Sequence, residues 1–382
     1  MSKYYYFPIL KTRPSEVNAY DILDSSVKDG VLPIIEMTGE LGYTYSQKHK
    51  DINLRGKRRP GDINKKIQKI LDFMGQRKFI LDITDDNLLK YDGLSDRSGG
   101  LLDPTNGYET WRNFLLQNPD FKNQVIPTIQ FNTIHRDNVE KQIIELDKTF
   151  NYIALKLPTS IPFNFSNEVN PISQIIDWIF QLIKKPKLFL ILDFDYLKAP
   201  DITQIQGKLT GIDITKLKAL IPVFSSFPSS VSSIGQPPIT IYENDISDWV
   251  QQSLKINVYH GDYSSIHPTR YETGGAGWLA RIDYIVRDKH TKRPLSYNYF
   301  RAIGKDNRNK SSSYYGLAKE VIVASDYVPV NEILTSGDQR IKAKANGGIE
   351  GKAPSYWITV RSNIYMTMQY IYLKKRGSFL VL

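Results

Sequence analysis

The sequence contains no cysteine and only five histidines among its 382 residues. The absence of cysteine excludes disulfides, thiolate metal sites and cysteine nucleophiles. The histidines are scattered and show neither HxH nor HExxH spacing, so a histidine-rich metal centre is not expected. The phosphate-binding GxxxxGK[ST] motif, the GxSxG motif and the protein-kinase motifs are also missing. The sequence therefore gives no indication of the enzyme classes that these motifs identify.

Long hydrophobic runs are missing as well. No stretch approaches the roughly 18–20 consecutive apolar residues of a membrane span, and the opening MSKYYYFPILKTRP has no apolar signal core with a small-residue cleavage site. Hydrophobic residues nevertheless make up 41% of the chain and aromatic residues 12%. This content is enough for a sizeable core. We therefore expect a globular cytoplasmic protein with no membrane partner.

Eight short apolar or aromatic runs recur along the first two thirds of the chain. They lack strict apolar/polar alternation, which is typical of strands buried on both faces, and segments with helical spacing separate them. Eight strand–helix units predict a parallel (β/α)8 TIM-barrel-like domain. A doubly wound open sheet is the alternative, although no strand is followed by GxGxxG. The predicted strands are residues 4–10, 32–37, 78–84, 124–131, 152–158, 188–195, 220–227 and 255–263.

The pattern changes after residue 268. We assign residues 1–268 to the barrel and residues 269–382 to a basic, tyrosine-rich α+β region. Alternating segments at 278–288 and 295–304 predict a hairpin, and residues 312–325 predict a helix. The net charge of the chain is +10, and from residue 271 onward 18 Lys and Arg stand against 9 Asp and Glu. The positive excess therefore belongs to this last third.

The predicted hairpin interleaves arginines with aromatic residues. Such a pattern can neutralise and stack a single-stranded nucleic acid. It is equally typical of a solvated sheet face or of a surface that docks a partner protein. The arginines are Arg281, Arg287, Arg293 and Arg301.

Polar side chains end every predicted barrel strand. In a parallel barrel the carboxyl ends of the strands meet at one mouth, where ligands bind. Asp193 and Asp195 are two residues apart in 188-LFLILDFDY-196 and are expected to share one strand face. The acidic candidates for catalysis are Glu36, Asp82, Asp193 and Asp195. The candidates for ligand binding are Lys11, Arg13, Lys156, Gln130, Asp262 and Tyr263.

A long loop after the second predicted strand, residues 38–62, adds positive charge. Its basic residues are Arg55, Lys57, Arg58 and Arg59. Long loops at the carboxyl ends of barrel strands commonly act as lids or binding elements. Basic side chains above an acidic mouth suit a phosphorylated or nucleotide-like ligand.

Three kinds of chemistry fit these residues. A metal-assisted phosphoester hydrolase would hold Mg²⁺ on the carboxylates and neutralise the phosphate with a lysine or arginine. Schiff-base chemistry would use Lys11 or Lys156, provided that burial lowers its pKa. A non-catalytic sensor or interaction module is the third reading, because no sharp catalytic motif is present.

Several motifs resemble those of the beta family proteins, a group found in phages and in bacterial mobile or defence-associated regions. The opening segments are 7-FPILKTRPSEVNAYDIL-23, 32-LPIIEMT-38 and 79-FILDIT-84, and the later ones are 260-HGDYSSIHP-268, 337-GD-338 and 357-WITVR-361. One departure is 362-SNIYMT-367, where the family pattern has paired histidines. The resemblance implies a barrel-like fold and a mobile-element or antiphage setting, but no reaction. It adds weight to Lys11, Arg13, Glu16, Glu36, Asp82, Asp262 and Tyr263 as motif positions.

Together these observations predict a phage-defence or mobile-element protein that binds a nucleotide or nucleic acid at the mouth. Metal-assisted hydrolysis is one activity considered for that site. The alternative is a non-catalytic module that docks a partner protein through its basic C-terminal region.

Overall fold

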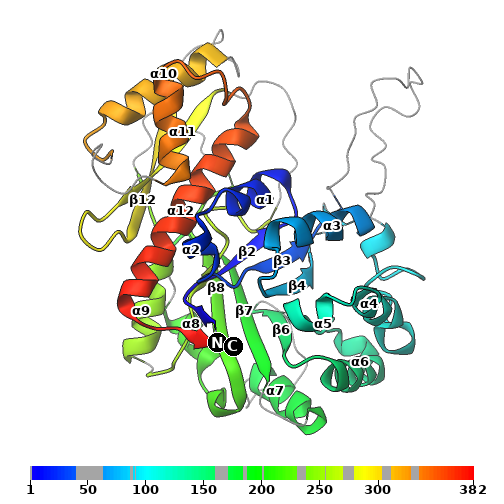
Figure 1. The fold of residues 1–382 in the computed structure, drawn as a ribbon. Helices are drawn as coiled ribbons and strands as arrows, with labels where there is room; N and C mark the ends of the chain where they lie inside the picture. The colour runs from blue at the N-terminus through cyan, green and yellow to red at the C-terminus, as the bar shows by residue number, and fades with distance from the viewer. Residues whose placement is uncertain are drawn as a thin grey trace, which may run out of the picture.

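A computed structural model describes residues 2–39, 63–86, 89–90, 92–159, 171–183, 187–199, 202–229, 238–253, 255–269, 279–302, 311–327 and 335–382. The basic loop residues Arg55, Lys57, Arg58 and Arg59 lie outside these ranges. Eight parallel strands form the centre of the structure (Figure 1). They are β2 (Phe7–Lys11), β3 (Ile34–Met37), β4 (Phe79–Ile83), β5 (Val125–Pro127), β6 (Ile153–Pro158), β7 (Leu188–Tyr196), β8 (Leu217–Ser225) and β10 (Gly261–Asp262).

The strands follow one another around the sheet in chain order. The sheet runs β5-β4-β3-β2-β10-β8-β7-β6, and a parallel bridge between Thr128 and Ala154 brings its two edges together. An open doubly wound sheet would instead reverse its strand order in the middle. The eight predicted strands are confirmed, and they form a nearly closed, (β/α)8-like barrel.

Both faces of the strands are buried. Inside the barrel, Phe7, Ile34, Ile80, Phe189 and Ile221 belong to one apolar cluster, and a second, larger cluster lies between the sheet and the helices. Double-sided burial explains why the strands read as continuous apolar runs.

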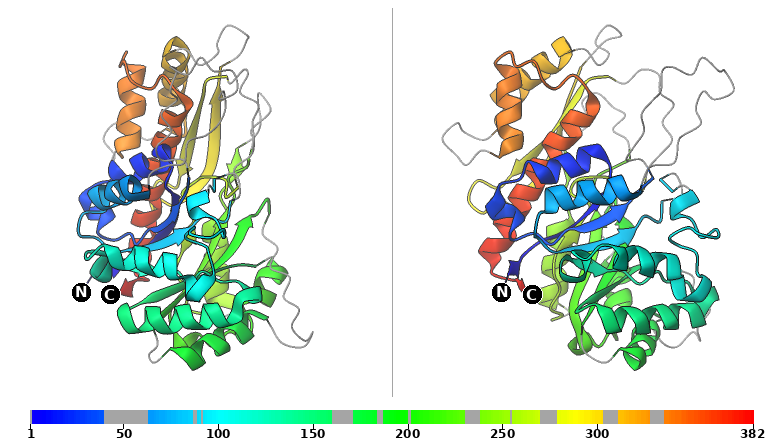
Figure 2. Two further views of the ribbon diagram at one scale, coloured as in Figure 1. Left: turned by 90° about the vertical axis from the view of Figure 1, so that its right-hand side faces the viewer. Right: turned by 45° about the vertical axis from the view of Figure 1, so that its right-hand side comes forward.

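Helices cover the outside of the barrel, as the sequence predicts (Figure 2). Among the described residues, no helix combines the length and the apolar character that crossing a membrane requires. The helices of this layer are α1 (Pro14–Asp21), α2 (Ser25–Lys28), α3 (Ile63–Met74), α4 (Thr105–Gln117), α5 (Phe121–Gln124), α6 (Arg136–Thr149), α7 (Pro171–Leu182), α8 (Ile202–Leu209) and α9 (Glu243–Ser253).

The predicted hairpin and helix of the C-terminal region are also present. Strands β11 (Arg281–Arg287) and β12 (Pro294–Arg301) pair antiparallel, and β9 (Ile239–Thr240) adds to β12. Helices α10 (Ser311–Val323) and α11 (Ser336–Ala345) stand beside them, at the end of the molecule opposite to the chain ends (Figures 1 and 2). Helix α11 begins with a capping box formed by Thr335 and Asp338.

The last helix, α12 (Pro354–Arg376), returns to the barrel. It packs along α1 and α2 on one side, while Gln369 and Arg376 hydrogen-bond to α9 on the other. Strand β13 (Leu380–Val381) then pairs antiparallel with β1 (Lys3–Tyr4). Helix α12 thus occupies the place of a barrel helix after the eighth strand, and β11, β12, α10 and α11 are inserted before it. The division of the chain at residue 268 stays a prediction, and these contacts give a way to test it.

Candidate functional site

The carboxyl ends of the barrel strands bring five predicted site residues into one mouth. Lys11, Glu36 and Asp82 lie side by side in register at the ends of β2, β3 and β4. Lys156 lies on β6, and Asp193 ends the regular pairing of β7 beside Pro158. The shared direction of the strands therefore places side chains that are far apart in the sequence at one end of the barrel.

Lys156 is the centre of this mouth. Its Nζ lies 2.5 Å from Glu36 Oε1, 2.9 Å from Asp82 Oδ2 and 3.2 Å from Asp85 Oδ2. Burial would lower the pKa of the Lys156 ammonium, but the surrounding carboxylates outweigh burial and hold this pKa well above its ordinary value. Schiff-base chemistry needs the opposite shift, so the geometry does not favour Lys156 as a nucleophile.

Glu36 bridges two lysines. Its second oxygen, Oε2, lies 3.6 Å from Lys11 Nζ, which is also 3.8 Å from Asp86 Oδ2 and donates to the Pro268 carbonyl. Burial alone would raise the pKa of the Glu36 carboxyl, but the ammonium groups of Lys156 and Lys11 outweigh burial and lower this pKa. Glu36 is therefore an ionised carboxylate at neutral pH.

The pKa of Asp82 shifts in the opposite direction to that of Glu36. Burial, together with the charges of Asp85 and Glu36, raises the pKa of Asp82 despite the attraction of Lys156. Thr128 donates a hydrogen bond of 2.7 Å to Asp82 Oδ1, and Gln130 Nε2 donates to Thr128 Oγ1 at 2.8 Å. Gln130 thus belongs to the mouth through Thr128, whose role the sequence analysis missed.

Asp193 is a half-buried carboxyl at the other side of the mouth. Burial raises its pKa to about 6, although Lys156 and a hydrogen bond from the Tyr263 hydroxyl oppose the shift. The expectation that Asp195 shares this face is wrong. The pairing of β7 becomes irregular after Asp193, and Asp195 is exposed with φ of 58°. Its backbone N–H donates to Asp193 Oδ1 at 3.0 Å.

A cavity of about 520 Å³ opens at this mouth. Asp82, Lys156 and Gln130, at or just after the strand ends, are among its lining residues, and we call the part around Asp82 and Lys156 its floor. Lys90, Asp96 and Arg97, which follow β4 in the chain, also line it. The remaining lining residues are Asp85, Ser95, Leu102, Tyr108, Ile129, Phe131, Asn132, Leu157 and Pro158.

Two predicted ligand-binding residues lie outside this cluster. Arg13 follows β2, and its Nε lies 2.5 Å from Glu16 Oε1. Asp262 points to the opposite face of β10, where it accepts hydrogen bonds from Tyr6, from Tyr365 of α12 and from the backbone of Ser264. Asp262 therefore holds α12 against the barrel wall.

The four hairpin arginines are largely committed to contacts within the protein. Arg281 lies 2.7 Å from Asp283, and the buried Arg287 lies 3.0 Å from Asp338 of α11. Arg293 pairs with Asp245 of α9, while Arg301 is half-buried at the end of β12. Nucleic-acid contact by these residues stays a prediction, but the ion pairs do not favour it.

Metal binding receives no support from the mouth. Within the ranges that the structure describes, no group of three or more His, Asp or Glu side chains is placed to hold a metal ion. The Lys156 ammonium lies between Glu36 and Asp82, where a divalent cation would otherwise bridge two carboxylates. The Mg²⁺ considered for these residues therefore has no evident ligand set.

Asp86 is a further mouth residue that the sequence analysis missed. It ends the run 84-TDD-86 after β4 and pairs with Lys11. Thr128, on the strand-end run 125-VIPT-128, is another. Both follow strand residues at the mouth, and this position was the available signal.

The fold and the site define an α/β barrel protein with a buried cluster of lysines and carboxylates at its mouth. The chain belongs to the Beta protein family, whose model matches residues 6–370. A relative is "Protein beta" of Enterobacteria phage P4, which is 24% identical over 381 residues and aligns with 96% of this chain and 93% of its own.

Two solved structures are distantly similar. The spore cortex-lytic enzyme SleL of Bacillus megaterium QM B1551 has a TM-score of 0.33 and 7% identity, over 83% of this chain and 68% of its own. The SleL of Bacillus cereus has a TM-score of 0.33 and 11% identity, over 91% and 75%. Scores at this level support no argument about the activity of this chain.

The raised pKa of Asp193 leads to a prediction about stability and pH. Because the folded state binds this proton more tightly than the unfolded chain, the contribution of Asp193 to wild-type stability should fall as the pH rises from about 4 to about 6. Asp193→Asn removes this dependence. We expect the stability of the variant relative to wild type to increase by about 1–3 kcal/mol between pH 4 and pH 7. Urea denaturation of both proteins across this range measures the difference.

Asp195→Asn is the matched control, because Asp195 is a neighbouring but exposed aspartate. Its free energy of unfolding, plotted against pH, should run parallel to that of the wild type. If the plot for Asp193→Asn also runs parallel to the wild type, then Asp193 does not take up a proton between pH 4 and pH 7.

Proposed function

We propose that the barrel mouth binds a nucleotide-like ligand through both its hydroxyl groups and its phosphate. The observation that carries this proposal is the division of charge within the 520 Å³ cavity. Its volume falls within the roughly 300–1,000 Å³ of small-molecule sites. Asp82 and Asp85 lie around Lys156 on the floor, whereas on the loop after β4 the two cations Lys90 and Arg97 outnumber Asp96.

The charges of the floor decide how such a ligand would be oriented. On the floor, Asp82 and Asp85 outnumber Lys156. In the neighbouring ion pairs, which do not line the cavity, Glu36 and Asp86 outnumber Lys11. A phosphate on this floor would be repelled, whereas sugar hydroxyls can donate hydrogen bonds to carboxylates. The phosphate is therefore placed toward Lys90 and Arg97.

Asp193, which lies at the same mouth but is not among the residues that line the cavity, adds a proton donor. A carboxyl with a pKa of about 6 beside the ionised Glu36 forms a pair of groups with opposite shifts, which is typical of acid–base sites. Hydrolysis of the bound ligand is compatible with this pair. Mg²⁺ is not part of the proposal, because the Lys156 ammonium already lies between Glu36 and Asp82.

A thermal-shift screen with AMP, adenosine and ribose 5-phosphate tests the proposal. A ligand that binds only the folded protein raises the Tm, so AMP at 100 times its Kd should stabilise by about 2.7 kcal/mol. The double variant Lys90→Glu/Arg97→Glu should lose the response to AMP but keep a weaker response to adenosine. Asp193→Asn should keep binding and lose any turnover. If none of the three compounds raises the Tm of a well-folded sample, the mouth is not a nucleotide site.

The second candidate is a non-catalytic module that docks a partner protein. It is favoured by two exposed apolar side chains of the C-terminal region, Val323 at 81% and Ile349 at 80% exposure. A negative ligand screen would shift the balance to this candidate. A role in phage defence or in a mobile element remains a proposal under either candidate.

A further inference from the structure

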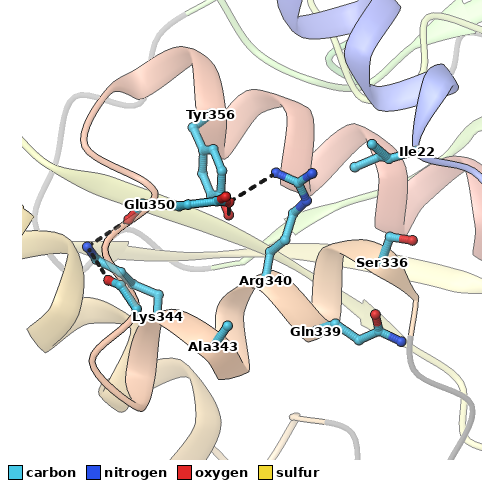
Figure 3. Close-up of a pocket in the computed structure, with 9 residues that line it drawn as sticks. Ile22, Ser336, Gln339, Arg340, Ala343, Lys344, Glu350 and Tyr356 are labelled. Atoms are coloured by element: carbon cyan, nitrogen blue, oxygen red, sulfur yellow. Dashed lines mark hydrogen bonds and ion pairs between the residues drawn. The ribbon is translucent and has the colours of Figure 1, made fainter.

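A second cavity lies away from the barrel mouth. It is open to solvent, has a volume of about 390 Å³ and lies between α11, Gly348 and Glu350 of the following segment, and Tyr356 at the start of α12, with Ile22 contributed from the end of α1 (Figure 3). The cavity thus joins the inserted C-terminal elements to the barrel. It is lined by Ile22, Ser336, Gln339, Arg340, Ala343, Lys344, Gly348, Glu350 and Tyr356.

One carboxylate of the protein already occupies a corner of this cavity. Glu350 Oε2 lies 3.7 Å from Arg340 Nη1 and accepts a 3.0 Å hydrogen bond from the Tyr356 hydroxyl. The Arg340 guanidinium lies 5.2 Å from the centre of the Tyr356 ring. A guanidinium and a phenol hydroxyl that converge on one oxygen form a receptor for a carboxylate.

Glu350 occupies this receptor only loosely. Its side chain is 70% exposed, and 3.7 Å is long for a charge-assisted hydrogen bond. Exposed ion pairs of this kind contribute little to stability. An external carboxylate can therefore compete with Glu350 for Arg340 and Tyr356.

Lys344 fixes the segment that carries Glu350. Its buried Nζ donates to the carbonyls of Gly348 at 3.1 Å and Glu350 at 2.7 Å. Burial and the nearby charge of Lys352 lower the pKa of this ammonium. Lys344 adds positive charge near the carboxylate corner and holds the backbone in place if the Glu350 side chain swings out.

Apart from Ser336 and Gln339, the side chains away from this corner are apolar. Ile22, Ala343 and the ring of Tyr356 face the cavity (Figure 3), whose volume suits a small molecule. We propose that this cavity binds an aromatic carboxylic acid. Its carboxylate replaces that of Glu350 on Arg340 and Tyr356, and its ring packs against Ile22 and Ala343. This inference is independent of the ligand proposed for the barrel mouth.

Titration calorimetry with sodium benzoate tests the inference, with benzamide as the uncharged probe of the same shape. We expect benzoate to bind at least about tenfold more tightly than benzamide. Arg340→Met should weaken benzoate binding at least about tenfold, because it removes the charged donor. Glu350→Gln should tighten binding by up to about fivefold, because it removes the internal competitor.

Arg136→Met is the matched control. Arg136 makes a similar set of contacts on α6, 3.4 Å from Glu140 and 4.9 Å from the Trp178 ring, and its loss should leave benzoate binding unchanged. Tyr356→Phe provides a second test should Arg340→Met fold poorly, with an expected severalfold loss. Equal binding of benzoate and benzamide, unchanged binding in Arg340→Met, or weaker binding in Glu350→Gln would each overturn the proposal.

Discussion

Replacing Lys156 by methionine should lower the free energy of unfolding by about 3–5 kcal/mol at pH 7, which is typical of breaking a buried ion pair. The Lys156 side chain is only 5% exposed, and both Glu36 and Asp82 are buried beside it. Methionine fills a similar volume but leaves these carboxylates without their shared cation. Chemical denaturation at pH 7 measures the loss.

The pH dependence of this loss distinguishes charge from packing. Without the ammonium, the folded-state pKa values of Glu36 and Asp82 rise above those of the unfolded chain, so the folded variant takes up protons as the pH falls. The difference in the free energy of unfolding between variant and wild type should therefore become smaller toward pH 4. A difference that does not change with pH would instead assign the lost stability to packing.

Lys148→Met is the control for an exposed pair. Lys148 lies 2.8 Å from Glu145, but its side chain is 59% exposed. The cost should be at most about 1 kcal/mol. In addition, the double variant Lys156→Met/Glu36→Gln should recover part of the lost stability, because it removes one of the stranded charges.

A chain that ends at Ala353, without α12 and β13, should not unfold cooperatively. Five apolar side chains of α12 are fully or almost fully buried, and each contributes roughly 1.5–3 kcal/mol. Their sum is comparable to the whole stability of a domain, about 5–15 kcal/mol. Near-UV circular dichroism and thermal unfolding report the result. The five residues are Val360, Ile364, Tyr365, Met366 and Met368.

The same experiment tests the division of the chain at residue 268. A chain that ends at Gly377 loses the short β1–β13 pairing, the ring contact between Phe379 and Tyr5 and the buried side chain of Leu380. It should remain folded with a modestly lower Tm. A chain of residues 1–268 should behave like the chain that ends at Ala353. Cooperative unfolding of residues 1–268 would instead establish the barrel as an independent domain.

The barrel could be predicted because its strands are buried on both faces and interrupted by polar ends. Lys11, Glu36, Asp82 and Lys156 were found by their positions at those ends. Asp195 was misplaced because the two-residue alternation of a strand fails where the backbone takes a positive φ. Side-chain direction in such an irregular strand end depends on tertiary contacts that a pattern does not contain.

The C-terminal region was harder to predict, because its side-chain contacts also depend on partners that are distant in the sequence. Its tyrosines and arginines suggested a surface, but Tyr284 and Tyr297 are buried, and Arg287 pairs with Asp338, 51 residues further along the chain. Helix α12 carries polar residues on its buried sides, such as Asn363 and Gln369, whose partners are Ala19 and Asn244. Local sequence holds no information about partners at such distances.

The position of α12 also has a consequence in time. Thr359 Oγ1 donates to the carbonyl of Ser15, a partner 344 residues earlier in the chain. At a synthesis rate of about 5–20 residues per second, α12 is synthesised roughly 20–70 s after α1, the helix that it covers. During this interval the surface of α1 that α12 later covers is exposed and can associate with other chains. The rate of translation, and not the folding rate of the barrel, therefore sets the lifetime of this association-prone intermediate.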